Sequence, residues 1–243
     1  AWKTSFFWDG RARTLREQVL QPIANPDEMA ETLPSVLGKL AADAGPNGYV
    51  EGFRWAFGTV EITADRLARA LEQFLLVQVS GNATFDRALR GEVTLSALEE
   101  RGFELFRTEF DPPRGLRGAD CFHCHGGALF TDHQFRNNGL AISEADLGRF
   151  RVTKAAIDRG TFSTPSLRNV AVTAPYMHDG RFSTLEQVLD HYSEGVQRTD
   201  TLDPNLAKHP DGGLHLTAEE KRAVIAFLKT LTDRRFEPVS RRR

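Results

Sequence analysis

The stretch Cys121-Phe122-His123-Cys124-His125 has the pattern CxxCH, which is the attachment sequence of a c-type haem. In such a sequence the two cysteines form thioether bonds to the haem, and the histidine that follows becomes the proximal ligand of the iron. The chain has no other cysteine, so no thiol is left for a disulfide framework or a four-cysteine zinc site. His123 is not expected to ligate, because its ring would point away from the iron. The motif therefore predicts one covalent haem c with His125 as its proximal ligand.

Two other uses of the CxxC pair stay open at this point. A zinc site of two cysteines and two histidines needs a His pair downstream, and His209 and His215, with five residues between them, form such a pair. They lie far from Cys124, however, and flank a Pro-Asp-Gly-Gly turn. A redox CxxC of the thioredoxin type normally accompanies a βαβ pattern, which this sequence lacks. A non-haem CxxC protein is therefore less favoured than a haem protein.

The composition is that of an ordinary soluble protein, with 40% hydrophobic and 26% charged residues and a formal net charge of −2. Such a balance argues against a nucleic-acid partner. No apolar run approaches the ~20 residues that a membrane span needs. The sequence opens at Ala1-Trp2-Lys3, so we expect that any signal peptide has been removed or was never included. Because haem c is attached outside the bacterial cytoplasm, the CxxCH motif alone predicts a periplasmic protein.

Helical periodicity is the main pattern along the chain, and strand signals are weak. One apolar stripe consists of Leu67, Leu71, Phe74 and Leu75. Three capping-box patterns predict further helix starts: Ser96 with Glu99, Thr184 with Gln187, and Thr217 with Glu220. The first of these helices should bury Leu98, Gly102 and Leu105 and end before Asp111-Pro112-Pro113. The second should carry Leu185, Val188, Leu189 and Tyr192 on one face, and the third Val224, Phe227, Leu228 and Leu231.

The order of a helix, CxxCH, an irregular segment from Arg136 to Thr173 and a C-terminal helix is that of a small cytochrome c domain. We therefore expect an all-α fold with a C-terminal cytochrome c domain at 91–236, a separate segment at 1–90 and a solvated basic tail at 237–243. Gly102 lies inside a predicted helix, where glycine costs up to about 1 kcal/mol against alanine. It predicts a close crossing of the C-terminal helix near Phe227, the alternative being an incidental glycine.

Long stretches of the chain resemble the bacterial di-haem cytochrome c peroxidases and the related MauG enzymes. They are Phe7-Trp8-Asp9-Gly10-Arg11 with Gln18, Pro22 and Glu28-Met29; Thr164-Pro165-Ser166-Leu167-Arg168-Asn169-Val170 with Thr173-Ala174-Pro175-Tyr176-Met177-His178-Asp179-Gly180; and Leu216 through Asp233. The match runs from about Ser5 to Asp233. In this family each of two haems has its own CxxCH, and the earlier motif carries the peroxide-reactive haem.

The sequence departs from the family in lacking the first CxxCH. The resemblance then implies that residues 1–90 are the remainder of an N-terminal, peroxidatic haem domain that is itself cytochrome c-like. Either the sequence is truncated, or another chain supplies the second haem, or the protein has only one.

The resemblance also assigns distal residues in the first 90 positions. Glu28 would transfer a proton between the peroxide oxygens, and Gln18 would orient peroxide or water by hydrogen bonds. Trp8 would relay electrons or holes between the haems, and Pro22 would shape the pocket wall. From the residues alone, Glu28 in Asn25-Pro26-Asp27-Glu28 is also typical of a helix N-terminus, and Trp8 of an aromatic core.

The sixth ligand of the haem on His125 has three candidates. By resemblance, the position seventeen residues after Pro175, which is a methionine in the peroxidases and a tyrosine in the MauG type, is Tyr192. A phenolate is a hard anionic donor that should lower the haem potential, whereas methionine raises it. Met177 and His191 are the rivals, and Tyr192 could also be a packed core residue.

The resemblance also implies a calcium site and an ion pair between an arginine and a haem propionate. The backbone carbonyls of Thr173 and Pro175 resemble positions that hold a calcium ion, as hard cations prefer oxygen ligands. Arg168 would pair with a propionate, the alternative being a surface arginine.

The resemblance implies a haem c oxidoreductase that reduces hydrogen peroxide, or uses it to form high-valent iron that oxidises a partner. One haem is covalent on this chain, a second is expected in the family, and calcium is a further cofactor to test. The partner would be an electron donor, such as a small cytochrome or cupredoxin, or an oxidised protein substrate, and a homodimer is a common arrangement. The alternative is a single-haem periplasmic electron-transfer cytochrome or subunit without peroxidase activity, although Gln18 and Glu28 have no use in such a carrier.

Overall fold

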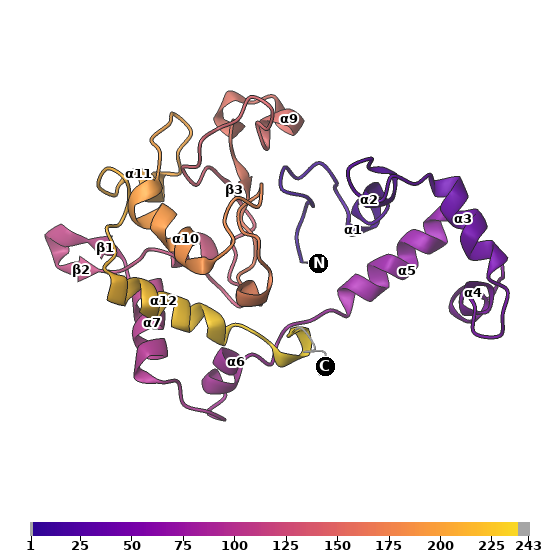
Figure 1. Cartoon of the computed structure of the whole chain (residues 1–243), viewed down its shortest axis with the longest axis horizontal. Helices are drawn as coiled ribbons and strands as arrows, with labels where there is room; N and C mark the ends of the chain where they lie inside the picture. The colour runs from indigo at the N-terminus through magenta and orange to yellow at the C-terminus, as the bar shows by residue number, and fades with distance from the viewer. Residues whose placement is uncertain (1, 238–243) are drawn as a thin grey trace. The chain divides into compact units, whose positions relative to one another are not determined.

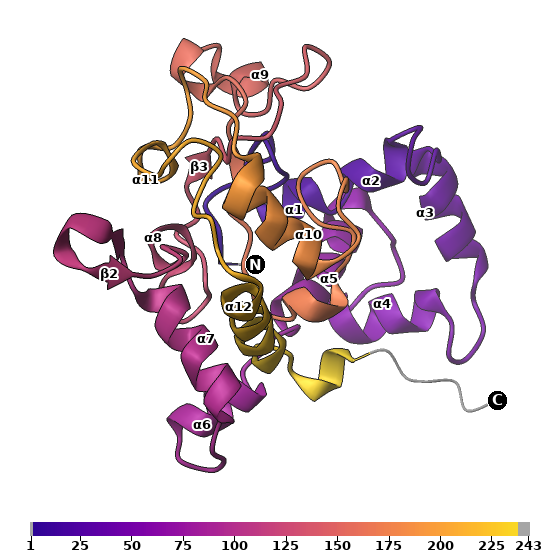
Figure 2. The same cartoon turned by 60° about the vertical axis from the view of Figure 1, so that its left-hand side comes forward.

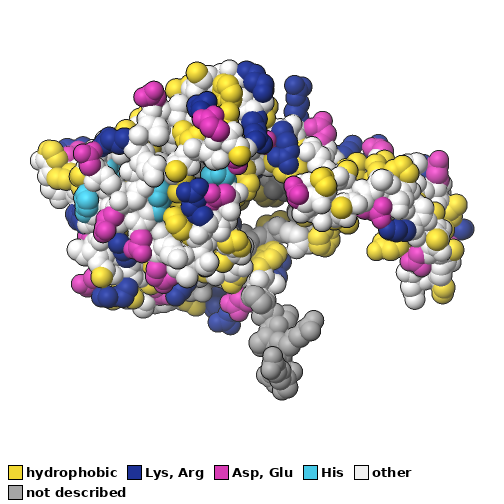
Figure 3. Space-filling view, turned by 45° about the horizontal axis from the view of Figure 1, so that its top comes forward, with side chains coloured by type: hydrophobic (Ala, Val, Ile, Leu, Met, Phe, Trp, Pro, Cys, Tyr) yellow, Lys and Arg dark blue, Asp and Glu magenta, His cyan; other side chains and the backbone are white. Residues whose placement is uncertain are grey.

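The computed structural model describes residues 2–237 of the chain. Of the basic tail predicted at 237–243, only Glu237 falls within the described residues. The chain divides into two compact units, Ala1–Val79 and Ser80–Arg243. Among the described residues, no helix combines the length and the apolar character that a membrane span requires. Lysines and arginines intermingle with acidic side chains on the face of the C-terminal unit drawn in Figure 3.

The N-terminal unit is helical and has a small core. Its helices are α1 (Leu15–Gln18), α2 (Gln21–Ala24), α3 (Leu33–Ala42), α4 (Tyr49–Phe57) and α5 (Ala64–Leu76). Leu15 and Val19 pack against Ala68 of α5, with Leu71 and Leu75 alongside. The helix predicted from the apolar stripe is therefore confirmed. Phe74, however, is 60% exposed, because the face that meets α1 is centred on Ala68.

The C-terminal unit is also rich in helix, with two short antiparallel pairs of strands (Figure 1). Its longer helices are α6 (Thr84–Leu89), α7 (Ala97–Arg107), α10 (Leu185–Asp190) and α12 (Ala218–Thr230). Its shorter ones are η1 (Pro112–Arg114), α8 (Phe122–His125), α9 (Phe150–Thr153), η2 (Ala156–Asp158), η3 (Val170–Val172), η4 (His191–Gly195), α11 (Pro204–Ala207) and η5 (Arg234–Phe236). Strand β1 (Phe110–Asp111) pairs with β2 (Leu116–Arg117), and β3 (Phe135–Arg136) with β4 (Phe162–Ser163).

All three predicted capping boxes are confirmed. Ser96, Thr184 and Thr217 each accept a hydrogen bond from the backbone N–H three residues on. The side-chain oxygen of the acid or amide at that position accepts one from the backbone N–H of the cap residue. These caps begin α7, α10 and α12. The start of each of these helices is therefore specified by the few residues of its own first turn.

Helices α7 and α12 pack against each other, as both views of the fold show (Figures 1 and 2). They approach most closely at Gly102. A Cβ atom at Gly102 would lie 1.9 Å from the carbonyl oxygen of Ala223 and 2.9 Å from Cβ of Phe227. The predicted crossing is thus confirmed, and only glycine allows the two backbones this approach. Leu105 and Gly102 are buried as predicted, but Leu98, in the first turn of α7, is 45% exposed.

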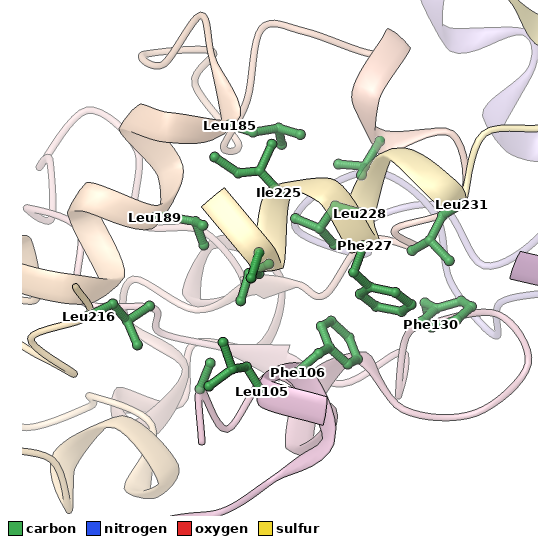
Figure 4. Close-up of a cluster of buried hydrophobic side chains, with 14 of the residues drawn as sticks. Leu105, Phe106, Phe130, Leu185, Leu189, Leu216, Ile225, Phe227, Leu228 and Leu231 are labelled. Carbon is green, nitrogen blue, oxygen red and sulfur yellow. The ribbon is translucent and has the colours of Figure 1, made fainter. Parts of the chain in front are cut away.

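The core of this unit forms around Phe227 (Figure 4). The rings of Phe85, Phe103 and Phe106 lie 5.1–5.2 Å from its ring, in tilted or edge-on contacts. Burying one such ring contributes about 1.5–3 kcal/mol. The core also includes Val224, Leu228 and Leu231, so the predicted face of α12 is confirmed.

The segment from Arg136 to Thr173 is mostly irregular, as expected, with only the short elements named above. After α7 the chain forms the β1–β2 hairpin rather than a plain loop. Its turn is formed by η1, where Asp111 accepts a hydrogen bond from the Arg114 N–H and Gly115 adopts a left-handed φ of 70°. The hairpin leads the chain from α7 into the CxxCH motif.

Candidate functional site

The CxxCH motif forms a single helical turn, α8, directly after the β1–β2 hairpin. The His125 N–H donates to the Cys121 carbonyl at 2.9 Å, which closes the turn. Asp120 precedes it with a left-handed φ of 53°, and its Oδ1 accepts the Phe110 N–H at 2.8 Å. Both thiols and the His125 ring are therefore held on one short, anchored segment.

The two thiols are half-buried and form no disulfide. Burial raises the pKa of Cys121 and of Cys124 to about 12 in each case. Such thiols stay protonated and are unlike the low-pKa cysteines of redox CxxC motifs.

The zinc alternative is not supported by the geometry. His209 bonds through Nε2 to Asp120 Oδ2 at 2.6 Å, and His215 donates through Nε2 to the Asp211 carbonyl at 3.1 Å. Within residues 2–237, neither cysteine belongs to a group of three ligand atoms close enough to hold an ion.

The two histidines of the motif have different partners. His125 Nδ1 donates to the Phe130 carbonyl at 3.2 Å, and burial lowers the pKa of its ring. The neutral ring therefore carries its proton on Nδ1 and its lone pair on Nε2, the atom that a metal needs. His123 Nε2 instead lies 3.1 Å from Glu109 Oε2. The turn thus offers two thiols and one imidazole nitrogen, the donor set of a haem c.

A buried charged cluster lies beside this turn, and the sequence analysis missed it. Lys208 Nζ is 3.0 Å from Asp120 Oδ2 and also pairs with Glu109. Burial by itself would raise the pKa of Asp120, but hydrogen bonds from His209 and Lys208 hold it below its usual value. The Lys208 ammonium bridges the two carboxylates, so the cluster serves to fix the segment that carries Cys121 and His123.

The α-helix that was expected to carry Tyr192 ends before it reaches this residue. α10 ends at Asp190, and residues His191–Gly195 form the π-turn η4. The α-helical phase that placed Tyr192 on the face of Leu185 and Leu189 is therefore not kept. Single π-turns are frequent at functional sites, because they re-aim one side chain.

Tyr192 and His191 are both inside the unit. Burial raises the pKa of Tyr192 to about 12, while a hydrogen bond with the Asn138 side chain opposes that rise. The charges that Cys124 and Cys121 acquire in the pH range where the phenol ionises also raise its pKa, so the ring lies near the CxxCH turn. His191 is 6% exposed, and its Nε2 donates to the Asn138 carbonyl at 2.9 Å.

Met177 lies in a loop with a left-handed φ of 72°, which costs a residue other than glycine about 1–2 kcal/mol. Its Sδ accepts a hydrogen bond from Asn138 Nδ2 at 3.5 Å. All three sixth-ligand candidates therefore meet at Asn138. No local pattern marks Asn138, since its partners are distant in the sequence.

The N-terminal unit carries the Trp8 segment. Phe7 has a φ of 67°, and the Arg11 guanidinium lies 3.5 Å from the centre of its ring. The Phe6 N–H donates to the Ala12 carbonyl at 2.8 Å, which closes the loop. Trp8 is 40% exposed, so the alternative of a core aromatic is wrong within this unit.

Gln18, Pro22 and Glu28 lie along the same short stretch. Gln18 is half-buried at the end of α1, and Pro22 is in the first turn of α2. Glu28 is exposed in a turn, not at a helix N-terminus, so that alternative is wrong. Its Oε1 accepts from Asn25 Nδ2 at 2.7 Å, and the Met29 N–H donates to the Pro22 carbonyl at 3.2 Å. The turn therefore holds Glu28 near Pro22.

Arg168 is engaged inside the C-terminal unit. Its two terminal nitrogens each donate to Asp86 at 3.0 Å, and its Nε donates to the Ala128 carbonyl at 2.8 Å. A haem propionate could bind Arg168 only by sharing its N–H donors with Asp86 and the Ala128 carbonyl. With its side chain only 14% exposed, Arg168 is not the free surface arginine of the alternative. Thr173 and Pro175 are both exposed, as a partly hydrated calcium site requires.

Comparison with known proteins gives the family. A family model described as di-haem cytochrome c peroxidase matches residues 1–94. The methylamine utilization protein MauG of Methylorubrum extorquens is 39% identical over 235 residues, which cover 95% of this chain and 62% of that protein. A cytochrome c551 peroxidase of Nitrosomonas europaea is 35% identical over 231 residues, covering 93% of this chain and 61% of that protein. The chain thus spans less than two thirds of the length of both relatives.

A solved structure agrees with these matches. The crystal structure of a MauG-like protein associated with microbial copper homeostasis superposes with a TM-score of 0.78 at 33% identity, covering 96% of this chain and 73% of that one. The chain belongs to the family of di-haem cytochrome c peroxidases and MauG proteins. Family membership makes haem c the expected cofactor.

Proposed function

We propose that this chain binds one haem c through Cys121 and Cys124, with His125 as the proximal ligand and Tyr192 as the sixth. The observation that carries the proposal is the His125 ring, whose Nδ1–H is held by the Phe130 carbonyl so that Nε2 keeps its lone pair. The position of Tyr192 near the same two thiols supports the second ligand. The cytochrome c-like haem domain expected at 91–236 is then contained in the C-terminal unit, which begins earlier, at Ser80.

The activity we propose is that of a peroxidase-like oxidoreductase. The haem supplies one-electron chemistry when it is bound. Hydrogen peroxide is reduced, or used to oxidise a protein or small-molecule partner, in a protein that contributes a second haem. Trp8 is the proposed relay residue, and its partly exposed indole suits transfer beyond its own segment.

Glu28 is the proposed acid–base residue. Cleavage of a peroxide bond needs a proton taken from one oxygen and delivered to the other. The Asn25 amide holds Glu28 Oε1 at 2.7 Å, which fixes the carboxylate and leaves Oε2 for the proton. Gln18 is proposed to orient the peroxide, and Pro22 to fix the turn through its bond to the Met29 N–H.

Localisation and the remaining partners follow from the same family. We place the protein in the periplasm, because haem c is attached there. Calcium on the carbonyls of Thr173 and Pro175, an electron-donor protein and a homodimer are parts of the proposal that need separate tests. Residues 1–90 are proposed to belong to the peroxidatic haem domain.

The test of activity is peroxide turnover by the haem-loaded protein and its Glu28→Gln variant. We expect a loss of about 10²–10⁴-fold in kcat/KM, the usual contribution of an acid–base residue. Asp27→Asn is the matched control, since Asp27 is an exposed acid in the same turn, and it should retain turnover. Full turnover in Glu28→Gln would show that this carboxylate is not catalytic.

A single-haem electron-transfer protein is the second candidate. One observation favours it: Glu28 is exposed. A carrier of this kind would exchange electrons with a reduced cytochrome but show no turnover with peroxide. The same assay therefore separates the two candidates.

A further inference from the structure

Asn138 is the meeting point of three segments of the C-terminal unit. Its backbone carbonyl accepts from His191 Nε2 at 2.9 Å, and its Nδ2 donates to Met177 Sδ at 3.5 Å. Its side chain is also hydrogen-bonded to Tyr192. One half-buried asparagine thus contacts all three candidate ligands.

The orientation of the Asn138 side-chain amide follows from its contact with the Leu140 N–H. Asn138 Oδ1 faces the Leu140 N–H at 3.4 Å, so the NH₂ group is the end that faces the ligands. An amide nitrogen has two protons, which suffice for one bond to the Met177 sulfur and one to the Tyr192 oxygen.

His191 is held back by the main chain. Because a carbonyl oxygen only accepts, the His191 nitrogen that faces Asn138 must carry its proton, and the lone pair lies on Nδ1. That atom faces the backbone of its own turn, since a Cβ placed on Gly195 would lie 3.2 Å from it. Neither nitrogen is therefore free to ligate.

Met177 is held back by the side chain. The Asn138 N–H bonds to its sulfur and anchors the side chain in place, whereas a methionine without such a bond is flexible and can swing toward a metal. The same side chain is hydrogen-bonded to the Tyr192 phenol, which fixes the position of that ring.

We propose that Asn138 is a positioning residue that selects Tyr192 as the sixth ligand and holds Met177 and His191 away from the iron. The inference rests on the proposed haem at Cys121 and Cys124. It predicts that loss of the amide, with the backbone bond to His191 intact, lets Met177 replace Tyr192.

The test compares the absorption spectrum and midpoint potential of the haem-loaded chain with those of Asn138→Ala. We expect the sulfur-to-iron band near the red edge to appear in the variant. We also expect at least a tenfold shift toward the ferrous form, about 59 mV for one electron. Asn205→Ala is the matched control, because Asn205 is a half-buried asparagine whose amide bonds only to Asp203, and it should leave both readouts unchanged.

Double variants show which side chain produces the change in the spectrum. The new band should vanish in Asn138→Ala with Met177→Leu. Tyr192→Phe alone, in which the amide still holds Met177, should lack the band, and adding Asn138→Ala to it should produce the band. Asn138→Leu, which keeps the side-chain volume without any donor, should reproduce the alanine result if alanine prevents folding.

The inference is overturned if the Asn138 variants keep the wild-type spectrum and potential, or if Tyr192→Phe alone, with the amide intact, already shows the sulfur-to-iron band. A wild-type chain that binds no haem overturns it as well, and the proposed function with it. Peroxide turnover plays no part in these readouts, so a failure of the peroxidase activity alone is distinguishable.

Discussion

For each histidine near the CxxCH turn, one hydrogen bond fixes which ring nitrogen is engaged and which is not. His125 binds the Phe130 carbonyl through Nδ1 and keeps Nε2, whereas His123 and His191 use Nε2 for Glu109 and the Asn138 carbonyl. Sequence shows which histidine follows the cysteines, but not which nitrogen carries the proton, because the acceptors are set by tertiary structure.

Replacing Tyr192 by phenylalanine tests the sixth ligand. We expect the spectrum of the haem to change and its resistance to ascorbate reduction to fall, because a phenolate stabilises ferric iron. Tyr176→Phe is the control, since the Tyr176 hydroxyl donates to the Val170 carbonyl at 3.0 Å and should leave the spectrum alone. An unchanged spectrum in Tyr192→Phe would rule this ligand out.

The Arg168–Asp86 pair should contribute measurably to stability. Both side chains are more than four fifths buried and share two 3.0 Å hydrogen bonds. We expect Arg168→Gln to lower the free energy of unfolding by about 2–3 kcal/mol. The exposed pair of Arg101 and Glu104 gives the control, with less than about 1 kcal/mol expected for Arg101→Gln.

Denaturant titration of Arg168→Gln, Asp86→Asn and the double variant separates two roles for Arg168. Strong coupling is expected from the direct pair. Independent, additive effects would mean that Arg168 acts on another group, such as a haem propionate.

Helices α7 and α12 show which features of the fold local sequence patterns can predict. Their caps, their starts and the glycine at their crossing were all predicted, because each depends on residues within one turn or on one steric requirement. The exposure of Leu98 and Phe74 was not, because periodicity gives a stripe but not the partner that covers it. The π-turn after α10 and the contacts of Asn138 are likewise tertiary, so the candidate site was predicted only in part.

Gly102→Ala should destabilise the protein. The added methyl would meet the Ala223 carbonyl at 1.9 Å, so the helices must separate, at a cost of about 1–3 kcal/mol or more. Gly52→Ala is the control: Gly52 lies inside α4 with no atom within 4 Å of an added Cβ. It should stabilise by about 0.5–1 kcal/mol. Equal thermal midpoints for the two variants would contradict the close crossing.

Asp233 should make stability depend on acid pH. It is 1% exposed, and its carboxylate accepts the N–H groups of Gly81 at 3.2 Å and Asn82 at 3.0 Å, which ties the end of α12 to the segment before α6. Burial would raise its pKa, but the hydrogen bonds from Arg235, Asn82 and Gly81 lower it to about 2.

Because that pKa is depressed on folding, the stabilisation is complete above about pH 4 and is lost as pH falls toward 2. Asp233→Asn should therefore cost about 2 kcal/mol at pH 7, and the difference from wild type should shrink between pH 4 and 2. Urea titrations across this range provide the measurement. A difference that is independent of pH would show that the charge is not involved.

At the scale of the whole molecule, the chain combines two units with different parts of the proposed chemistry. The C-terminal unit has the haem attachment turn and the ligand candidates, and the N-terminal unit has Trp8, Gln18 and Glu28. The long motifs predicted the family from the sequence alone, and the comparisons confirm it. The units are joined by a few residues around Val79, so each can be tested for its own contribution.

Covalent haem on Cys121 and Cys124 is the central claim. The most direct test is the intact mass of the protein, purified from a host that attaches haem c, together with its pyridine haemochrome absorbance and a peptide map. The account predicts one haem for this sequence, on the peptide that contains both cysteines. The unmodified polypeptide mass, with both thiols free to titrate after denaturation, would contradict it.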